Sequence, residues 1–265
     1  MKPWALLKKL YQVNLIKPRG VCRLIHSFWM DGFNLMAILR FVSRQYPNYI
    51  AITDDKETIS YKELFIQTLN VACCLQEKYN IGTKQKVAIA GRNHAALIKA
   101  VFAVSQSGAD VYLLNTDMSK DQFNTLIQHH SFNLIIHDDS FTEIIQQSAY
   151  SQPAILTYHH QLTSINSFSN TIGNSKSIKR KSRSGNIVVL TAGTTGHFKT
   201  AARKQSATSF LSPLYCLLQR LNLNAYSTVY IATPAYHGFG FAAIVMSVLL
   251  QKRYLYQRTL MQKRL

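Results

Sequence analysis

The first third of the chain contains a clearly marked amphipathic helix. Apolar Leu64, Val71 and Leu75 recur at intervals of seven and four residues, which places them on one face of a helix. Ser60 stands three residues before Glu63, the spacing of a capping box in which each side chain binds the backbone N–H of the other residue. The pattern therefore predicts a helix that begins at residues 60–63.

Beyond this helix, short apolar runs alternate with helical segments. The apolar runs occupy residues 87–90, 111–114, 134–136 and 154–156. Residues 94–107 repeat apolar positions at helical spacing and end at Gly108, a residue suited to a left-handed C-cap. Ser119 and Ser140 each precede, by three residues, a side chain able to complete a capping box, and should begin two further helices. Such alternation predicts an α/β fold with mostly parallel sheets covered by helices.

A polar segment, residues 163–185, interrupts this alternation. It is rich in Ser, Asn and Lys, carries the basic run 176–183, and is expected to be a linker. After it, the pattern predicts a strand at 187–190, a helix at 210–221, a strand at 229–232, a buried helix at 239–250 and a strand at 254–256. Whether the linker separates two domains or two parts of one sheet stays open at this stage.

The composition is that of a globular protein with a strong positive charge. Hydrophobic residues make up 47% of the 265 residues and charged residues 16%, which allows a sizeable core and is not typical of a disordered chain. The formal net charge is +18, and all 12 acidic residues lie at or before Glu143. Such a field attracts phosphates, acyl-CoA, anionic lipid or nucleic acid without specifying a fold.

Cysteine usage and apolar stretches indicate a cytoplasmic protein, either soluble or associated with the inner surface of the membrane. The four cysteines, at positions 22, 73, 74 and 216, lack CxxC spacing and are expected to be small buried residues in a reducing compartment. Lys8 and Lys9 interrupt the apolar N-terminal run and no small-residue cleavage site follows, which argues against a secretory signal. The late apolar run 239–250 is too short to span a bilayer.

The most informative segment is a Gly/Thr-rich loop that directly follows an apolar strand. Residues 190–199 read Leu-Thr-Ala-Gly-Thr-Thr-Gly-His-Phe-Lys. Glycines let backbone amides converge on one anion, threonine hydroxyls add donors, and the lysine adds a positive charge. We predict a phosphate-binding loop formed by Thr191, Gly193, Thr194, Thr195, Gly196 and Lys199. It is not a Walker A loop, and composition alone leaves a Thr/Gly-rich turn between two strands as the alternative.

The order of these residues resembles the Thr-Ser-Gly-Thr-Thr-Gly-x-Pro-Lys-Gly signature of the adenylate-forming superfamily, which contains acyl-CoA synthetases, luciferases and peptide-synthetase adenylation domains. The resemblance implies that the loop holds the β and γ phosphates of ATP. Ala192, Phe198 and Thr200 depart from the signature. Loss of a hydroxyl at Ala192 removes one hydrogen bond to phosphate, an effect of about 1–3 kcal/mol for a charged acceptor, so weakened rather than abolished binding is expected.

Three further segments extend the resemblance over roughly residues 33–256. Residues 60–64 match the family's Thr-Tyr-x-Glu-Leu helix start, and residues 108–116 are similar to the Gly-Ala-Asp strand of bacterial long-chain fatty acyl-CoA synthetases. Residues 233–240 resemble the family's Pro-x-x-His-x-x-Gly segment, which lies by the substrate carboxylate and the acyl tunnel. A lone histidine beside a glycine is more often a packed or turn residue. The resemblance instead implies a substrate-gating role for His237 and Gly238.

Taken together, the resemblance implies that residues 1–265 are the N-terminal AMP-binding domain of an ATP-dependent fatty acid–CoA ligase. Such a ligase joins a fatty acid to AMP, releases pyrophosphate and then passes the acyl group to coenzyme A, so ATP, Mg²⁺ and coenzyme A are the implied cofactors. Lys199 is the expected catalytic residue, because its charge would stabilise the leaving phosphates. Residues 144–265 contain no Asp or Glu, and no metal ligand is assigned.

The family's magnesium-binding carboxylate, ribose-binding aspartate and adenylation lysine have no counterpart in this sequence. We therefore expect a domain that is incomplete on its C-terminal side, either a truncated gene product or one piece of a split enzyme that cannot complete the reaction alone. A fatty acid is the expected substrate. A missing C-terminal half and an anionic membrane surface are the expected partners.

Two other classes of function stay open. Clustered Lys and Arg at 176–183 could bind nucleic acid phosphates, but the run has no interleaved aromatic residues, so a solvated loop is favoured and nucleic acid is not the expected partner. The other alternative is a non-catalytic module that binds nucleotide or an acyl chain. Substrate turnover would separate the enzyme from such a module, and a steep salt dependence of oligonucleotide binding would indicate a nucleic-acid-binding protein.

Overall fold

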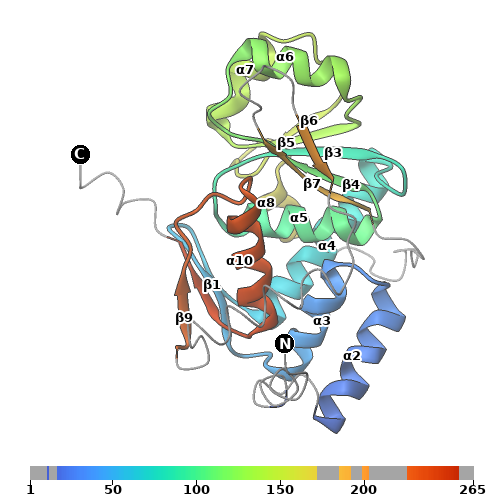
Figure 1. Cartoon of the computed structure of the whole chain (residues 1–265), viewed down its shortest axis with the longest axis vertical. Coiled ribbons are helices and arrows are strands. Elements are labelled where there is room, and N and C mark those ends of the chain that lie inside the picture. Colours follow the sequence, from blue (N-terminus) through green and yellow to red (C-terminus); the bar gives the residue numbers. More distant parts are fainter. Residues whose placement is uncertain (1–10, 12–16, 172–184, 192–198, 203–225, 257–265) are drawn as a thin grey trace.

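Two β-sheets and the helices around them form the protein in a computed structural model (Figure 1). The structure describes residues 11, 17–171, 185–191, 199–202 and 226–256, without the side chains of residues 191 and 199–202. Its elements, in chain order, are α2 (Pro18–Asp31), α3 (Leu35–Gln45), β1 (Ile50–Thr53), β2 (Thr58–Ser60), α4 (Tyr61–Tyr79), β3 (Lys86–Ala90), α5 (Ala95–Ser107), β4 (Asp110–Leu113), α6 (Lys120–His129), β5 (Leu134–His137), η1 (Asp139–Phe141), α7 (Thr142–Gln146), β6 (Ala154–Leu156), α8 (Ile165–Ser169), β7 (Ile187–Thr191), β8 (Lys199–Ala202), β9 (Thr228–Tyr230), α10 (Gly238–Leu249) and β10 (Arg253–Leu255).

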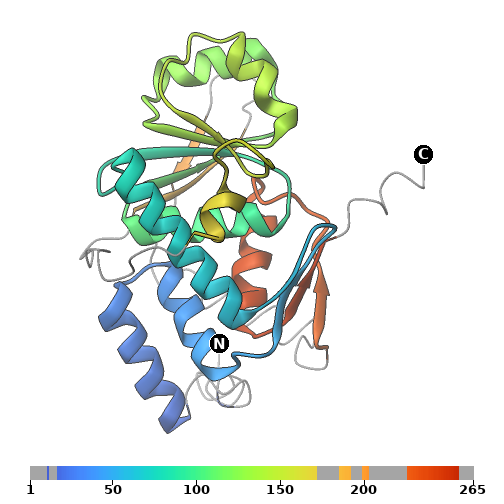
Figure 2. The same ribbon diagram turned by 180° about the vertical axis from the view of Figure 1, so that it is seen from behind.

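The larger sheet has six described strands in the order β6-β5-β3-β4-β7-β8. Neighbouring strands are parallel except for β7 and β8, which are antiparallel. Helices α6 and α7 lie on one face of this sheet, and α4, α5 and α8 lie on the other (Figures 1 and 2). The predicted α/β class, with a mostly parallel sheet covered by helices, is confirmed.

Helix α5 is the most buried element of the fold. Every one of its residues is buried, because the helix lies between strands β3 and β4 on one side and α4 on the other. It ends at Gly108, whose φ of 77° confirms the predicted left-handed C-cap. The capping boxes predicted at Ser60 and Ser119 are also confirmed, at the starts of α4 and α6. The helix predicted to open at residues 140–143 is present as α7, which begins at Thr142, but Ser140 does not cap it because it lies inside the preceding 3-10 turn.

The smaller sheet joins segments from both ends of the chain. Its described strands follow the order β2-β1-β10-β9, and β10 pairs in parallel with both β1 and β9. The Tyr61 hydroxyl at the start of α4 donates to the carbonyl of Lys252, 2.8 Å away, beside β10. Since β7 joins the larger sheet and β9 and β10 join the smaller one, residues beyond the expected linker contribute to both sheets.

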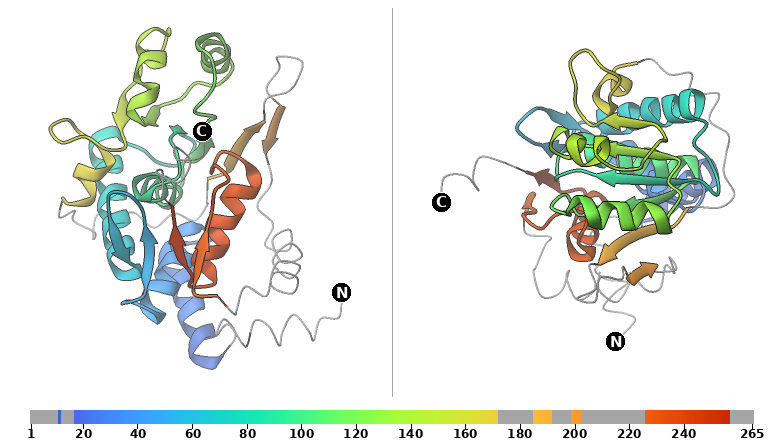
Figure 3. Two further views of the ribbon diagram at one scale, coloured as in Figure 1. Left: turned by 90° about the vertical axis from the view of Figure 1, so that its left-hand side faces the viewer. Right: turned by 90° about the horizontal axis from the view of Figure 1, so that it is seen from above.

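Two N-terminal helices, α2 and α3, were not predicted from the apolar pattern. The Asn34 side chain caps α3 by accepting a hydrogen bond from the Ala37 N–H, 3.1 Å away. Helix α3 packs against α4, α5 and α10, whereas α2 packs on α3 at the periphery of the molecule (Figures 1 and 3).

The segment expected to be a linker begins with an ordered turn, α8. Ser164 caps this helix, and Ile165 and Phe168 are fully buried, so the expectation of a loop from residue 163 is wrong for this part. Two apolar side chains three residues apart anchor the turn against α4 and α5. The basic run 176–183, the predicted helix 210–221 and Cys216 lie outside the described residues.

The cysteine expectation is confirmed in part by the described residues. Cys73 and Cys74 are buried in α4, and burial raises the pKa of both thiols. Cys22 is exposed on α2, which corrects the expectation for that residue.

Candidate functional site

The predicted phosphate loop connects two paired strand ends at an edge of the larger sheet. Thr191, the last residue of β7, lies directly opposite Lys199, the first residue of β8, in the antiparallel ladder. The structure therefore brings the two ends of the predicted loop together at the carboxyl end of β7. Gly193, Thr194, Thr195 and Gly196 lie outside the described residues. Ligands of parallel α/β sheets bind outside the carboxyl ends of the strands, which is where this loop is attached.

A second part of the site follows β3, where a buried asparagine holds the segment that carries His237. The Asn93 amide donates to the carbonyl of Thr233, 2.8 Å away, and its side-chain oxygen accepts from the Ala235 N–H at 2.7 Å. Only 2% of Asn93 is exposed. Sequence reasoning missed Asn93, although its place directly after a buried parallel strand is a signal for a residue at the sheet's binding edge.

His237 and Gly238 lie at the N-terminus of α10, and both are exposed. The His237 backbone N–H donates to the carbonyl of Pro234, 3.0 Å away, and its carbonyl accepts from the Phe241 N–H at 3.0 Å. The imidazole makes no capping hydrogen bond to the helix and lies 4.8 Å from the Tyr236 ring, centroid to centroid.

Tyr236 links this segment to the carboxyl end of β4. Its hydroxyl donates to a carboxylate oxygen of Asp117, 3.4 Å away. Burial raises the pKa of Tyr236, so the phenol stays protonated and remains a donor at neutral pH. The segment that precedes α10 is thus attached to the loops that follow both β3 and β4.

Gly240 allows the chain to turn closely at the start of α10. A β-carbon at this position would lie 2.2 Å from the Pro234 carbonyl oxygen and 2.6 Å from that of Thr233. At Gly238, by contrast, a β-carbon would meet nothing within 4 Å. The predicted gating residue Gly238 therefore borders open space, whereas the unpredicted Gly240 sets the shape of the segment.

A partly buried carboxylate, that of Asp138, joins the carboxyl ends of β3, β5 and β6. The carboxylate of Asp138 accepts hydrogen bonds from His94 Nε2 at 2.8 Å, Thr157 Oγ1 at 2.6 Å and the Arg92 N–H at 2.8 Å. His94 Nδ1 accepts from the Leu97 N–H, 3.0 Å away, so the proton of this imidazole lies on Nε2 and points to Asp138. Burial opposes ionisation of Asp138, but the hydrogen bonds from His94, Arg92 and Thr157 outweigh it and lower the pKa of the carboxyl group.

Asp138→Asn is expected to lower the free energy of unfolding at pH 7 by about 2–4 kcal/mol, because an amide cannot accept all three hydrogen bonds. The folded-state pKa of Asp138 is lowered, so its stabilisation is present above the unfolded pKa and is lost as the pH falls through the folded value. The difference between the two proteins should therefore narrow below about pH 4. Urea unfolding followed by circular dichroism measures it, with exposed Asp139→Asn as the control. An equal effect of both variants would contradict the assignment.

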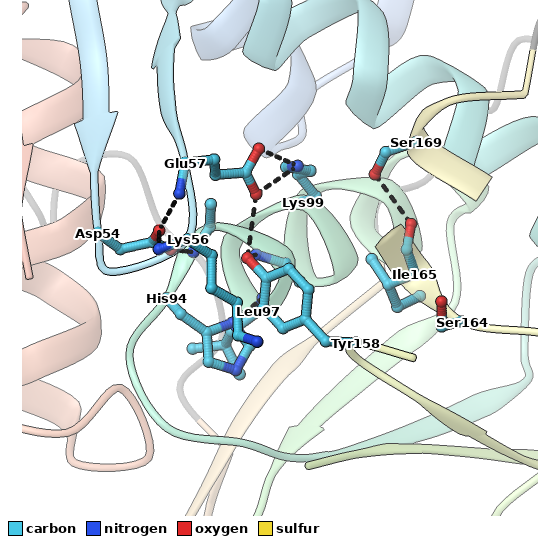
Figure 4. Close-up of polar contacts among 12 residues, drawn as sticks. Asp54, Lys56, Glu57, His94, Leu97, Lys99, Tyr158, Ser164, Ile165 and Ser169 are labelled. Carbon is cyan, nitrogen blue, oxygen red and sulfur yellow. Dashed lines mark hydrogen bonds and ion pairs between the residues drawn. The ribbon is translucent and has the colours of Figure 1, made fainter. Parts of the chain in front are cut away.

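A second buried charge cluster holds the β1–β2 hairpin against α5 (Figure 4). Lys99 Nζ donates to both carboxylate oxygens of Glu57, at 2.8 and 2.9 Å, and the Tyr158 hydroxyl donates to the same carboxylate at 3.0 Å. Asp54 accepts from the Ala95 N–H, 2.7 Å away, at the positive end of α5. Burial lowers the pKa of Lys99, and the charge of Glu57 opposes this. The cluster fixes the start of α5 and, with it, the residues Asn93 and His94 that precede this helix.

Within the described residues, no group of three or more His, Cys, Asp or Glu side chains is arranged to hold a metal ion. None of the described helices combines the length and the hydropathy that a membrane crossing requires. The described part of the chain therefore offers a polar site at the strand ends, where the partly buried carboxylate of Asp138 already accepts three hydrogen bonds.

The chain belongs to the AMP-binding enzyme family, whose model matches residues 39–257. These residues form the N-terminal region of an adenylate-forming enzyme. A search of curated proteins gave no match.

Solved structures of similar fold agree with this assignment. O-succinylbenzoate coenzyme A synthetase (MenE) from Bacillus subtilis, in complex with AMP, superposes with a TM-score of 0.66 at 20% identity over 83% of this chain and 55% of that one. The N-terminal domain of FACL13 from Mycobacterium tuberculosis gives 0.70 at 14% identity over 84% and 57%. The luciferase-like enzyme from Zophobas morio gives 0.69 at 18% identity over 86% and 55%. The chain thus spans 55–57% of the length of these proteins.

Proposed function

We propose that this chain binds ATP through the loop between β7 and β8 and takes part in forming a fatty acyl adenylate. The observation that carries the proposal is the position of the Gly/Thr-rich motif, which stands between the paired residues Thr191 and Lys199 at the carboxyl end of a parallel strand. Among the similar structures, one MenE structure is described in complex with ATP and a magnesium ion.

The proposed chemistry divides the site into two parts. Backbone amides of the loop and Lys199 hold the β and γ phosphates while a fatty carboxylate attacks the α phosphorus and pyrophosphate leaves. His237 and Gly238, which the Asn93 contacts hold at the start of α10, border the acyl group. Coenzyme A accepts the acyl group in the second half-reaction.

The hydrogen-bond donors of the proposed loop fit nucleotide phosphate better than a magnesium ion, which binds oxygen ligands. Residues 144–265 hold no carboxylate, and the described residues hold no three-residue metal cluster. Since the chain spans 55–57% of these solved chains, we further propose that these residues alone bind ATP without completing ligation.

Lys199→Met is expected to weaken MgATP binding about 10- to 100-fold, because a charge-assisted hydrogen bond to phosphate contributes about 1.5–3 kcal/mol. Isothermal titration calorimetry measures the change. Lys62→Met, at an exposed position on α4, removes the same charge elsewhere and should leave binding unaltered. An equal loss in both variants would point to a general effect of charge and would contradict the proposed loop.

An ATP–pyrophosphate exchange assay with a long-chain fatty acid tests the second half of the proposal. Binding without exchange is the expected result for the chain alone. Exchange would show that the chain alone catalyses adenylate formation and would contradict the proposed incompleteness, and absence of MgATP binding would refute the nucleotide site itself.

A further inference from the structure

Helix α2 carries two large apolar side chains on the outside of the molecule, whereas its Leu24 packs against the core. Ile25 is 63% exposed and Trp29 is 65% exposed, and their spacing of four residues places them on one face of the helix. The buried positions of the same helix are Gly20, Ser27 and Asp31. A surface helix that only stabilises a fold has polar side chains at such outer positions.

A buried ion pair fixes this orientation of α2. Asp31, which is 1% exposed, forms an ion pair with Arg40 of α3, and Arg40 Nη2 donates to Asp31 Oδ1 at 2.7 Å. The Gln106 amide of α5 donates to the same oxygen at 3.3 Å. Rotation of α2 to bury Ile25 and Trp29 would separate Asp31 from Arg40, and unpaired buried charges are strongly unfavourable.

The apolar stripe continues beyond the C-terminal end of the helix. Phe33 is 75% exposed, the highest value among the exposed large hydrophobic residues of the described chain, and its ring stacks on Phe28 with the centroids 4.6 Å apart. Phe33 lies outside the helix, after Gly32 with its φ of 82°, so the stacking on Phe28 rather than helical spacing places it at the end of α2. We call the three side chains, Ile25, Trp29 and Phe33, the α2 stripe.

Positive charge accompanies the α2 stripe. Lys17, Arg19 and Arg23 are exposed on the same helix and its N-cap, and Arg19 and Arg23, again four residues apart, form a basic row of their own. The first 30 residues of the sequence contain six Lys or Arg and no Asp or Glu. An acidic protein surface would complement these charges as well, but aromatic and aliphatic side chains beside a basic row are typical of helices that lie in the interface of an anionic bilayer.

We propose that α2 docks this protein onto an anionic phospholipid surface, with the α2 stripe inserted at the level of the headgroups and Arg19 and Arg23 in contact with lipid phosphates. The helix lies at the periphery of the fold, with α3 between it and the rest of the molecule, so it reaches a flat surface without rearrangement (Figures 1 and 2). The docking surface is separate from the strand-edge site, and it does not depend on the proposed function.

Co-sedimentation of the full chain with vesicles tests the proposal. The chain should bind vesicles of phosphatidylcholine and phosphatidylglycerol, bind pure phosphatidylcholine far less, and lose affinity as salt is raised. Ile25→Ser/Trp29→Ser should reduce the affinity at least about 10-fold. Arg19→Gln/Arg23→Gln should reduce it about 30-fold, as expected for two basic residues near the surface. Equal binding to both vesicle types would overturn the proposal.

Matched variants at positions away from α2 distinguish docking through α2 from non-specific hydrophobic binding and from a general effect of net charge. Ile66→Ser removes an exposed isoleucine from α4, and Lys62→Gln/Lys120→Gln removes two exposed charges from α4 and α6. Both should bind vesicles as the parent chain does, and a loss as large as that of the α2 variants would refute the assignment to α2. A dimer that the α2 stripe variants abolish, without vesicle binding by the parent, would assign the stripe to a second copy of the chain and overturn the proposal.

Tryptophan fluorescence gives a second readout that needs no change to the stripe. The chain has two tryptophans, so Trp4→Phe leaves Trp29 as the single emitter. Its emission should shift to shorter wavelength on addition of anionic vesicles, because the exposed indole enters a less polar medium. Vesicle binding without such a shift would show that another surface makes the contact.

Discussion

Glu57→Gln is expected to lower the free energy of unfolding by about 3–5 kcal/mol, the loss typical of removing one partner from a buried ion pair. The Lys99 side chain is completely buried, and its ammonium group donates to both oxygens of Glu57. With glutamine at position 57, Lys99 must either stay charged without a counter-ion or release its proton, and both are unfavourable. Urea unfolding followed by circular dichroism at pH 7 measures the loss.

The double variant Glu57→Gln/Lys99→Met distinguishes an unpaired charge from simple loss of contacts. Methionine has a similar length and no charge, so the double variant should regain most of the stability that Glu57→Gln loses. The loss of unfolding free energy in Glu57→Gln should also become smaller as the pH rises toward about 10. The pKa of Lys99 is lower in the folded state than in the unfolded state, so the folded variant can release the proton of Lys99 at a lower pH. Exposed Glu77→Gln should change stability by less than about 0.5 kcal/mol. A double variant no more stable than Glu57→Gln would contradict the explanation.

Local signals in the sequence were sufficient to predict much of the sheet and its helices. The capping boxes at Ser60 and Ser119 and the C-cap at Gly108 depend on residues within four positions of one another, so a pattern along the chain contains all the information. Helix α2 was missed for a physical reason. Its fully buried positions are Gly20, Ser27 and Asp31, which interrupt the apolar period on the face where Leu24 packs against the core.

The sequence predicted the site only where its residues form one continuous segment of the chain. The loop from Thr191 to Lys199 is one such stretch, and its strand ends are indeed paired. Asn93 and Asp138 act through contacts that are distant along the chain: Asn93 binds Ala235, 142 positions away, and Asp138 binds His94, 44 positions away. The spacing of apolar residues along the chain contains no information about such contacts. The consecutive polar residues 92–94, placed between a buried strand and a buried helix, are the signal that could have indicated them.

Gly240→Ala is expected to lower the free energy of unfolding by about 2–3 kcal/mol, although alanine is intrinsically favoured over glycine in a helix by about 1 kcal/mol. The new methyl group would lie 2.2 Å from the Pro234 carbonyl oxygen and 2.6 Å from that of Thr233. Neither oxygen can withdraw easily, because Asn93 binds the Thr233 carbonyl and His237 binds that of Pro234. The clash must therefore displace the start of α10, including His237.

Gly238→Ala provides the matched control two residues away on the same helix. A β-carbon there meets no atom within 4 Å, so stability should stay the same or rise by up to about 1 kcal/mol. Chemical denaturation of both variants, together with the ¹H–¹⁵N chemical shift of the His237 amide, separates the two cases. The shift should move in Gly240→Ala, because the hydrogen bond to Pro234 is disturbed, well beyond the small change expected in Gly238→Ala. Equal stabilities would mean that the segment relaxes around the methyl group and that Gly240 does not set the position of His237.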